Sequence, residues 1–345
     1  MKKQIFILVV MFIAATATVF GQALPGTKAV PLTCAANDPL NPIAGRPYDY
    51  TAIINPTGGT AYWYATKSTT FTTAGARVAV EIPADGAAIA TGAVNYRTSA
   101  VSATSPTKTT VTWTSAGLDG VDATTKPLFM VVEYAGATCA DNLKVMQILP
   151  KVAFTVDITN MKHGATPTPL AYGTAENQCF DKVQSAKFNA GKIEIDYGTN
   201  VLYFEVIGAN FTGTYKPTLK LSGLSGTQTA TIDWGYAIGT TATNLVTDAA
   251  APTVTTPQFT VTTNEPSTAE GVSIFVKVTI KNHGFEGIAD LPVTLAVEAV
   301  DGTTTANKDV EPDCTTFVDF GDQAVQTLKA RPAVTEGTKQ VPQLP

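Results

Sequence analysis

Two acidic residues, Glu194 and Asp196, have the spacing of a catalytic carboxylate pair. They are two positions apart in a strand-like stretch, so their side chains point the same way at roughly 6–7 Å, a separation suited to acid/base chemistry on a sugar. The alternative is a solvated polar face opposite Ile193 and Ile195, and alternation alone accounts for both acids. We therefore expect no catalytic residue here.

The two histidines, His163 and His283, offer little for nucleophilic catalysis, because each precedes a glycine in a turn-like context. A catalytic histidine needs a nucleophile on one side and an orienting group on the other. The best match to a nucleophile elbow, residues 223–227, ends in Thr227 instead of glycine. Phosphate-binding glycine motifs are also missing from the sequence. We expect a protein that is not an enzyme and that carries no cofactor.

An aromatic cluster is formed by Tyr62, Trp63 and Tyr64. In a strand the two tyrosines share one face and the tryptophan takes the other. Exposed tyrosines could stack on sugar rings or anchor a protein partner. Core packing is the simpler interpretation, since tryptophan is usually mostly buried. These three residues are the candidate ligand-binding residues.

Metal binding is not expected. Asp119 with Asp122, and Asp319 with Asp322, offer oxygen ligands for calcium, but neither pair reproduces a dense D-x-D-x-D-G loop. The sequence has no C-x-x-C pair and its histidines stand alone, which argues against zinc.

The four cysteines are Cys34, Cys139, Cys179 and Cys314, and four cysteines allow three pairings. The first two are 105 residues apart and the last two are 135 apart, each about the size of one domain. This spacing favours Cys34–Cys139 and Cys179–Cys314 disulfides, each contributing about 4–5 kcal/mol by the loop-entropy model. Such bridges need an oxidising compartment.

Residues 1–21 have the features of a signal peptide. Lys2 and Lys3 precede an apolar run, and Val19 and Gly21 supply the small residues of a cleavage site. Later stretches fall short of the ~18 apolar residues of a membrane-spanning helix. We expect a secreted protein, located in the periplasm, at the cell surface or outside the cell.

The composition excludes one class of partner. The 345 residues include 23 Lys+Arg and 28 Asp+Glu, a net charge of −5, and only 15% are charged against a typical ~25%. Nucleic acid is therefore not an expected partner, because phosphate neutralisation needs a basic surface. Hydrophobic residues make up 44%, enough for a sizeable core.

Strand-like runs occur along the whole sequence and carry most of the candidate residues named above. β-rich runs separated by turn residues occupy residues 49–55, 60–66, 77–82, 109–114, 128–134 and 143–149. A two-residue period marks residues 193–197, 272–281 and 293–299, whose apolar faces predict a second sandwich core. Residues 176–188 carry a weak helical signal that a strand fits equally well, and residues 240–256 are expected to be a low-complexity loop.

We predict an all-β protein with two tandem Ig-like β-sandwich domains, residues 22–150 and 151–332, followed by a flexible tail at 333–345. The boundary lies at or just after Pro150, with residues 163–169 as an alternative. The tail could add a strand to a neighbouring sheet, although disorder fits its composition better.

Residues 129–141, followed by 143–149, resemble the last hairpin of Ig/PKD-like domains in secreted bacterial surface proteins. The shared features are a hydrophobic strand, a Gly136-x-x-Cys139-x-Asp141 turn and a final strand. Residues 30–34, ending at Cys34, resemble the opening strand that bears the partner cysteine. Many such domains belong to adhesins or envelope assemblies linked to gliding motility and type IX secretion. The sequence shows no type IX sorting domain and no LPxTG motif.

These observations predict a secreted, non-catalytic envelope or surface protein with a structural or adhesive role. Its expected partners are other surface proteins or a second copy of itself, joined through sheet edges. The alternative is a carbohydrate-binding module or weak glycoside hydrolase that uses Tyr62, Tyr64, Glu194 or Asp196 on glycans.

Overall fold

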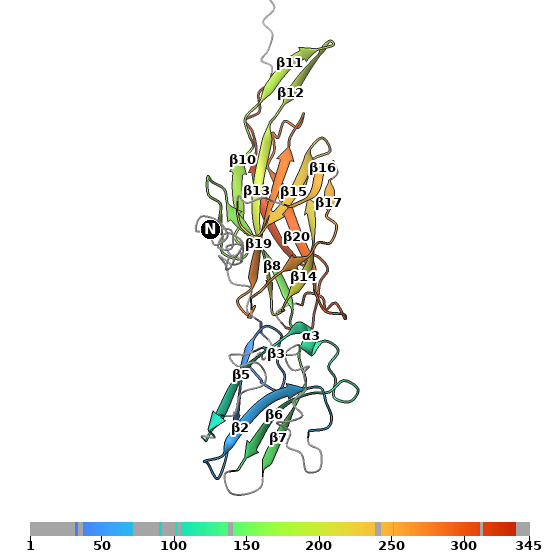
Figure 1. Ribbon diagram of the computed structural model, residues 1–345. Helices are drawn as coiled ribbons and strands as arrows, with labels where there is room; N and C mark the ends of the chain where they lie inside the picture. The colour runs from blue at the N-terminus through green and yellow to red at the C-terminus, as the bar shows by residue number, and fades with distance from the viewer. Residues whose placement is uncertain are drawn as a thin grey trace, which may run out of the picture.

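The computed structural model describes residues 32–33, 37–71, 90–91, 101–102, 105–136, 141–238, 243–250, 252–265, 267–310 and 313–335. These parts are almost entirely β-structure, with a single helical turn, α3 (Ser115–Leu118). The predicted all-β class is confirmed. Two sheet-rich regions lie end to end along an elongated molecule (Figure 1). Within the described residues, no helix is long and apolar enough to cross a membrane.

The N-terminal region, residues 37–149, contains two sheets. The first has the order β1-β5-β3 and the second β4-β2-β6-β7. Their strands are β1 (Pro47–Ala52), β2 (Thr60–Thr66), β3 (Ala90–Thr91), β4 (Val101–Ser102), β5 (Thr107–Trp113), β6 (Leu128–Ala135) and β7 (Asn142–Ile148). Large aromatic side chains fill the core between them. The Trp113 ring packs edge-on against Tyr50 at 6.2 Å, and its Nε1–H donates to the Tyr50 hydroxyl at 2.9 Å.

The C-terminal region, residues 150–335, is built on two larger sheets. The β13 sheet has the order β16-β15-β19-β13-β8-β9, and the β20 sheet has the order β10-β21-β20-β14-β17, with β18 also paired to β14. The strands of the β13 sheet are β8 (Thr155–Lys162), β9 (Thr168–Pro169), β13 (Thr199–Ala209), β15 (Thr229–Gly235), β16 (Thr243–Ala249) and β19 (Val272–Lys281). Those of the β20 sheet are β10 (Glu176–Cys179), β14 (Thr214–Ser222), β17 (Thr253–Thr255), β18 (Val261–Thr262), β20 (Leu291–Asp301) and β21 (Asp322–Lys329).

Each region has its own hydrophobic cluster. One cluster joins apolar side chains of the β13 and β20 sheets, from Phe154 to Leu328, and the other lies between Tyr48 and Ile148. The predicted sandwich arrangement of facing sheets agrees with this distribution. The domain boundary at Pro150 stays a prediction.

Hydrogen bonds join the two regions. The Ser115 amide donates to Thr212 Oγ1 at 2.7 Å, and the Thr212 amide donates back to Ser115 Oγ at 2.8 Å. Arg46 Nε donates to Asn210 Oδ1 at 2.6 Å. Gly45 has φ +72°, and a Cβ there would lie 2.3 Å from Thr268 Oγ1, so this close approach requires glycine.

Sequence periodicity located the long strands well and the short edge strands poorly. The predicted run 60–66 coincides with β2, and residues 272–281 coincide with β19. One expectation is wrong in part, because the expected loop at 240–256 contains β16 and β17. Residues 176–188, whose pattern fitted a helical turn or a strand equally well, hold β10 and the start of β11 (Ser185–Asn189). β16 is an edge strand with little burial on either face, so it has no apolar alternation to detect.

Several predictions fall on residues outside the described ranges. They are the signal peptide at 1–21, the strand at 77–82, Cys34, Cys139 and most of the tail at 333–345.

Candidate functional site

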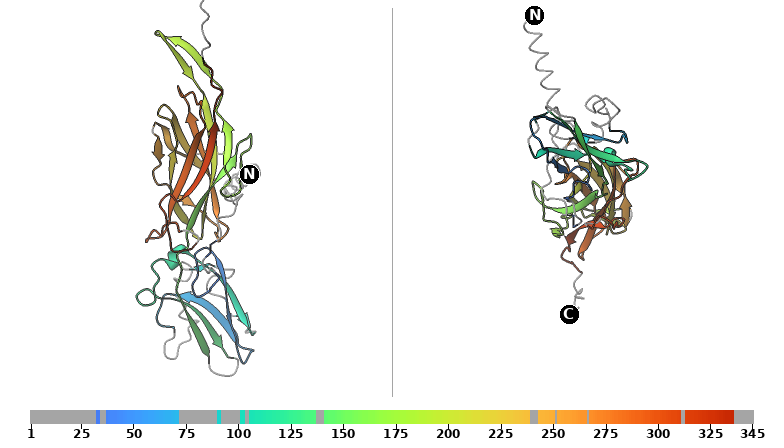
Figure 2. Two further views of the ribbon diagram at one scale, coloured as in Figure 1. Left: turned by 180° about the vertical axis from the view of Figure 1, so that it is seen from behind. Right: turned by 90° about the horizontal axis from the view of Figure 1, so that it is seen from below.

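A two-stranded hairpin extends beyond the large sheets at the end of the C-terminal region. Its strands are β11 (Ser185–Asn189) and β12 (Lys192–Asp196), which form a sheet of their own. Ala190 and Gly191 join them with φ of 45° and 83°, as a type I′ turn requires at both central positions. The hairpin projects from the same end in both side views (Figures 1 and 2).

The hairpin register places its apolar residues on one face. Phe188 lies opposite Ile193, and Ala186 lies opposite Ile195. Phe188 is 77% exposed and Ile193 is 73% exposed. The predicted strand at 193–197 is therefore confirmed, but its predicted place in a sandwich core is wrong, because the hairpin extends past the sheets that could cover it. The result is an apolar face open to solvent, which we call the hairpin ridge: Ala186, Phe188, Ile193 and Ile195.

The base of the hairpin is fixed by a carboxylate. Asp181 Oδ2 accepts hydrogen bonds from the Thr199 amide at 2.9 Å and from Gln184 Nε2 at 3.0 Å. These bonds, the Thr199 amide first, lower the pKa of Asp181. Gly198 has φ +77°, and a Cβ there would lie 2.4 Å from Asp181 Oδ2. Only glycine therefore lets the chain pass the carboxylate at this point.

A cation holds the other side of the base. The Arg331 guanidinium lies over the rings of Tyr197 and Phe180, 5.1 and 5.5 Å from their centroids, and Nη2 donates to the Tyr197 carbonyl at 2.7 Å. The Tyr197 amide donates to the His283 carbonyl at 2.9 Å. An isolated two-stranded hairpin is marginally stable in water. These contacts anchor this one in a defined direction.

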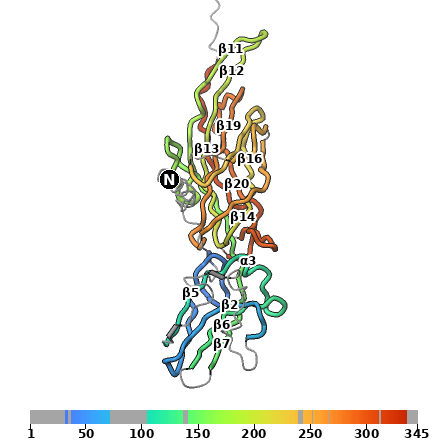
Figure 3. Tube along the Cα trace, viewed as in Figure 1, coloured from blue at the N-terminus to red at the C-terminus, as the bar shows by residue number. Residues whose placement is uncertain are grey.

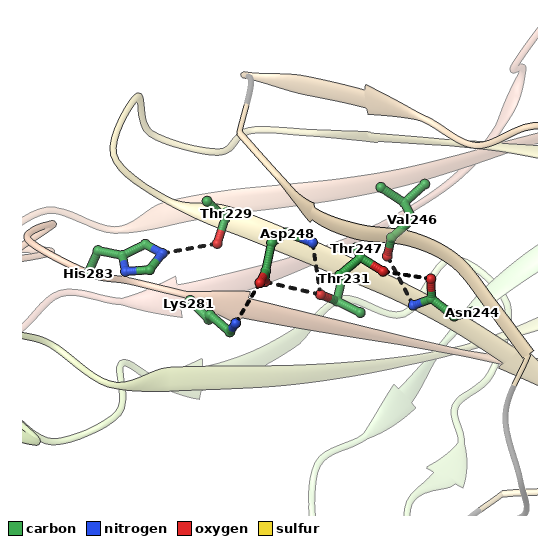
Figure 4. A network of polar contacts seen from close by, with 8 residues as sticks. All are labelled: Thr229, Thr231, Asn244, Val246, Thr247, Asp248, Lys281 and His283. Carbon is green, nitrogen blue, oxygen red and sulfur yellow. Dashed lines mark hydrogen bonds and ion pairs between the residues drawn. The ribbon is translucent and has the colours of Figure 1, made fainter.

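By contrast, a nearby sheet edge is closed by polar contacts (Figure 4). The Asp248 carboxylate of edge strand β16 pairs with Lys281 Nζ at 2.8 Å and accepts from Thr231 Oγ1 at 3.4 Å. The β15–β16 register is also shifted between Ala230 and Asp233, as in a β-bulge. Bulges and charges of this kind protect an edge against pairing with another chain.

The aromatic cluster is not an exposed tyrosine pair. Trp63 is 0% exposed and Tyr64 is 1% exposed, which leaves Tyr62 partly exposed. Trp63 belongs to the core between the sheets, and Tyr64 packs with Val131 on the other face of β2. The interpretation as core packing is therefore confirmed for Trp63 and Tyr64. The alternative, an exposed stacking surface of Tyr62 and Tyr64, is wrong, because both faces of this strand carry apolar packing.

The paired acids lie on the polar face of the hairpin. Glu194 Oε1 accepts from Asn189 Nδ2 at 3.3 Å, and Asp196 Oδ1 accepts from the Gly198 amide at 2.9 Å. The strand geometry predicted for the pair is present. Both residues are exposed on a sheet two strands wide, so the hairpin provides no wall to enclose a sugar.

The histidines occupy turns, as their sequence contexts indicate. The His163 amide donates to Glu176 Oε1 at 3.0 Å in an exposed segment. His283 has φ 48° in the turn that follows β19 and Asn282, and its Nε2 lies 3.0 Å from Thr229 Oγ1 (Figure 4).

The predicted Cys179–Cys314 disulfide is wrong. Cys179 is a free, exposed thiol, whereas Cys314 is disulfide-bonded. Cys179 pairs with Lys329 at the last residue of β21, and Cys314 lies in the loop before the first residue of that strand. Cys179 thus lies at the far end of β21 from the point where the loop that holds Cys314 enters the strand.

The aspartates that were weighed as calcium ligands make other contacts. The Asp119 carboxylate accepts from the amides of Thr304 and Thr305, at 3.1 and 3.4 Å, across the junction between the two regions. The Asp122 carboxylate accepts from the backbone of its own turn. In the part of the chain that the structure describes, no three His, Cys, Asp or Glu side chains are grouped to hold a metal ion.

A half-buried acid pair, Asp309 and Asp322, has no counterpart in the sequence motifs. Asp309 Oδ1 accepts from the Val156 amide at 2.9 Å, and Asp322 Oδ1 accepts from the Tyr172 hydroxyl at 2.8 Å. Burial, together with the neighbouring Asp322 and Asp157 carboxylates, raises the pKa of Asp309 to about 9. Burial also raises the pKa of Asp322, so the fold favours a proton on this pair. No sequence signal could find it, because its members are brought together only by the fold.

No family model and no curated protein matches the chain. Among solved structures, the N-terminal domain of PorA is similar at 12% identity and a TM-score of 0.24, covering 51% of this chain and 96% of that one. The major pilin SpaD of Corynebacterium diphtheriae is similar at 12% identity and a TM-score of 0.25, and the match covers 79% of this chain and 58% of SpaD. The T6 backbone pilin of Streptococcus pyogenes is similar at 11% identity and a TM-score of 0.19, and the match covers 82% of this chain and 64% of the pilin. The chain thus spans less than two thirds of either pilin, and scores this low identify no function.

Proposed function

We propose that the chain is a non-catalytic structural or adhesive component of a bacterial envelope or cell surface, and that the hairpin ridge is its docking element. The exposed pair Phe188 and Ile193, held on an anchored base, carries the proposal. Exposed apolar patches on soluble proteins commonly mark interaction sites.

The energetics indicate what kind of docking this is. Burial of a Phe or Ile side chain contributes about 1.5–3 kcal/mol, so Phe188 and Ile193 together contribute about 3–6 kcal/mol. Association costs an estimated 4–15 kcal/mol in lost freedom of motion. The two side chains are therefore insufficient alone. The unpaired outer edges of β11 and β12 offer backbone hydrogen bonds to an added strand, which supply the remainder.

The carbohydrate-binding alternative depended on Tyr62 and Tyr64 sharing an exposed face, and Tyr64 is buried. The glycosidase alternative depended on Glu194 and Asp196, which lie on the face of the hairpin opposite the hairpin ridge. Neither alternative has a supporting observation as strong as the ridge.

The test is retention of the labelled protein on envelope fragments from the producing cells. We expect Phe188→Ser with Ile193→Ser to reduce retention at least tenfold. The matched control, Lys187→Ser with Lys192→Ser, changes the opposite face of the same strands, leaves Glu194 and Asp196 in place and should bind like wild type. Equal retention of the ridge variant and the wild type would falsify the docking role.

A further inference from the structure

The end of the molecule opposite the hairpin carries a hollow lined by apolar side chains and by the polar residues Asn55, Asn142 and Lys144. Its volume is about 330 Å³, and its walls include Ile53, Ile54, Pro56, Val132, Tyr134 and Leu143. The hollow lies where β1, an edge strand of the first sheet, ends beside β6 and β7 of the second. Ile53 at its mouth is 88% exposed. The Tyr134 hydroxyl donates to the Pro56 carbonyl at 2.8 Å and fixes one wall.

The hollow and the hairpin ridge cannot meet within one molecule. β13 begins just after the hairpin and runs eleven residues, about 36 Å, to Asn210 at the junction with Arg46. From Arg46, β1 leads directly onward to Ala52 at the edge of the hollow. The path from ridge to hollow thus follows the long axis of the molecule (Figure 3).

We propose that the hollow receives the hairpin ridge of a second copy, so that copies associate head to tail. This inference rests on the proposed function and names the partner. The ridge presents a large apolar side chain beside an aliphatic one. The hollow is near the lower limit of ligand pockets, ~300–1,000 Å³, and its apolar part is formed by Ile53, Ile54 and Leu143.

Charge and backbone geometry support the same occupant. Lys144 is an exposed cation on the rim of the hollow, and Glu194 and Asp196 are exposed on the hairpin. β7 is the last strand of its sheet, so its outer edge can pair with an incoming β11 or β12. A contact between two different surfaces of the same chain does not close on itself, and it generates chains of molecules unless the rotation forms a ring.

The experiment compares two variants by analytical ultracentrifugation. The ridge variant carries Phe188→Ser and Ile193→Ser, and the hollow variant carries Ile53→Arg. Both change exposed side chains, so the fold is expected to persist, which circular dichroism verifies. The control Thr51→Arg adds the same charge at an exposed position that does not line the hollow.

We expect wild type and control to form oligomers whose size grows with concentration, and each variant alone to associate at least tenfold more weakly. An equimolar mixture of the two variants should form a 1:1 dimer and grow no further, because each partner retains one intact surface.

Other outcomes overturn the inference in distinguishable ways. If the hollow variant oligomerises like wild type, or the mixture forms no dimer, the hairpin docks elsewhere and the head-to-tail contact is wrong. If wild type stays monomeric while its retention on envelopes still depends on the ridge, the partner is another molecule and the proposed function stands. If the ridge variant behaves as wild type in both assays, both proposals fail.

Discussion

The strands β19 and β12 show the same alternation and opposite burial. In β19, Ile274, Val276 and Val278 are fully buried between the two large sheets, whereas Ile193 of β12 is 73% exposed. β19 pairs with β13 and β15 along its length, whereas β12 pairs with β11. Alternation therefore identifies which face of a strand is apolar, and the fold decides whether anything in the same chain covers it. An uncovered apolar face is where a partner gains most by binding.

The largest expected effect is in the core. Leu295 of β20 is fully buried, so Leu295→Ala should lower the free energy of unfolding by about 2–5 kcal/mol, through lost burial and a residual cavity. Urea denaturation measures this change as a shift in midpoint at constant m-value. A loss below about 1 kcal/mol would contradict the close packing that distinguishes this core from the hairpin.

The next effect concerns the base of the hairpin. Gly198→Ala forces a left-handed backbone onto alanine and drives its Cβ against Asp181 Oδ2, so we expect a cost of about 1–3 kcal/mol. Hydrogen exchange should show this loss in residues 184–198 and leave β19 protected. Gly191→Ala is the control, because Gly191 has a similar φ of +83° with no atom within 4 Å of the added Cβ. Equal costs at both positions would show that the Asp181 contact contributes nothing.

Carboxylates give a third contrast, because burial raises the pKa of Asp309 to about 9 whereas hydrogen bonds lower the pKa of Asp181. Between the unfolded pKa of ~3.9 and about 9, the folded state binds more protons at Asp309 than the unfolded state. Wild-type stability at this site therefore falls as the pH rises through that window.

The asparagine of the Asp309→Asn variant cannot ionise. The free energy of unfolding of this variant should therefore rise relative to that of wild type between pH 5 and pH 9, by about 1 kcal/mol or more at pH 9. Thermal melts at pH 5, 7 and 9 measure the difference. A constant difference across the three values would mean that Asp309 titrates normally.

The smallest expected effect is on the hairpin ridge. Ile193→Ala should change the free energy of unfolding by less than about 0.5 kcal/mol, because its side chain is mostly exposed. The same urea titration that measures Leu295→Ala measures this variant. A loss of 2 kcal/mol would mean that the ridge packs within its own chain, and the comparison with β19 would fail.

Prediction from sequence was most reliable for strands whose residue pattern shows that one face must pack against a core. The buried runs at 60–66 and 272–281 were located because one face of each must meet a core. Residues 176–188 were ambiguous because Phe180 and Val183 imitate helical spacing, although Phe180 is buried beside Arg331 and Val183 is exposed.

Only part of the candidate site could be predicted from the sequence. Alternation identified the strand at 193–197, but its exposure depends on how far β11 and β12 extend beyond the sheets. The hollow could not be predicted, because Ile53, which follows β1, and Leu143 of β7 are about ninety residues apart in the chain. The error in the disulfide pairing has the same origin, since loop length says nothing about which end of β21 each cysteine occupies.

The continuity of β13 from the hairpin base to the junction has a mechanical consequence. Tension applied to the hairpin passes through Tyr197 and Gly198 into β13, and the neighbouring strand β8 leads back along the chain into the N-terminal region. Because β13 and β8 are antiparallel and are pulled from opposite ends, the hydrogen bonds that join them from Phe204 to Ala209 are sheared together instead of being peeled one at a time. The strand that separates the two ends therefore also helps to keep them joined under force.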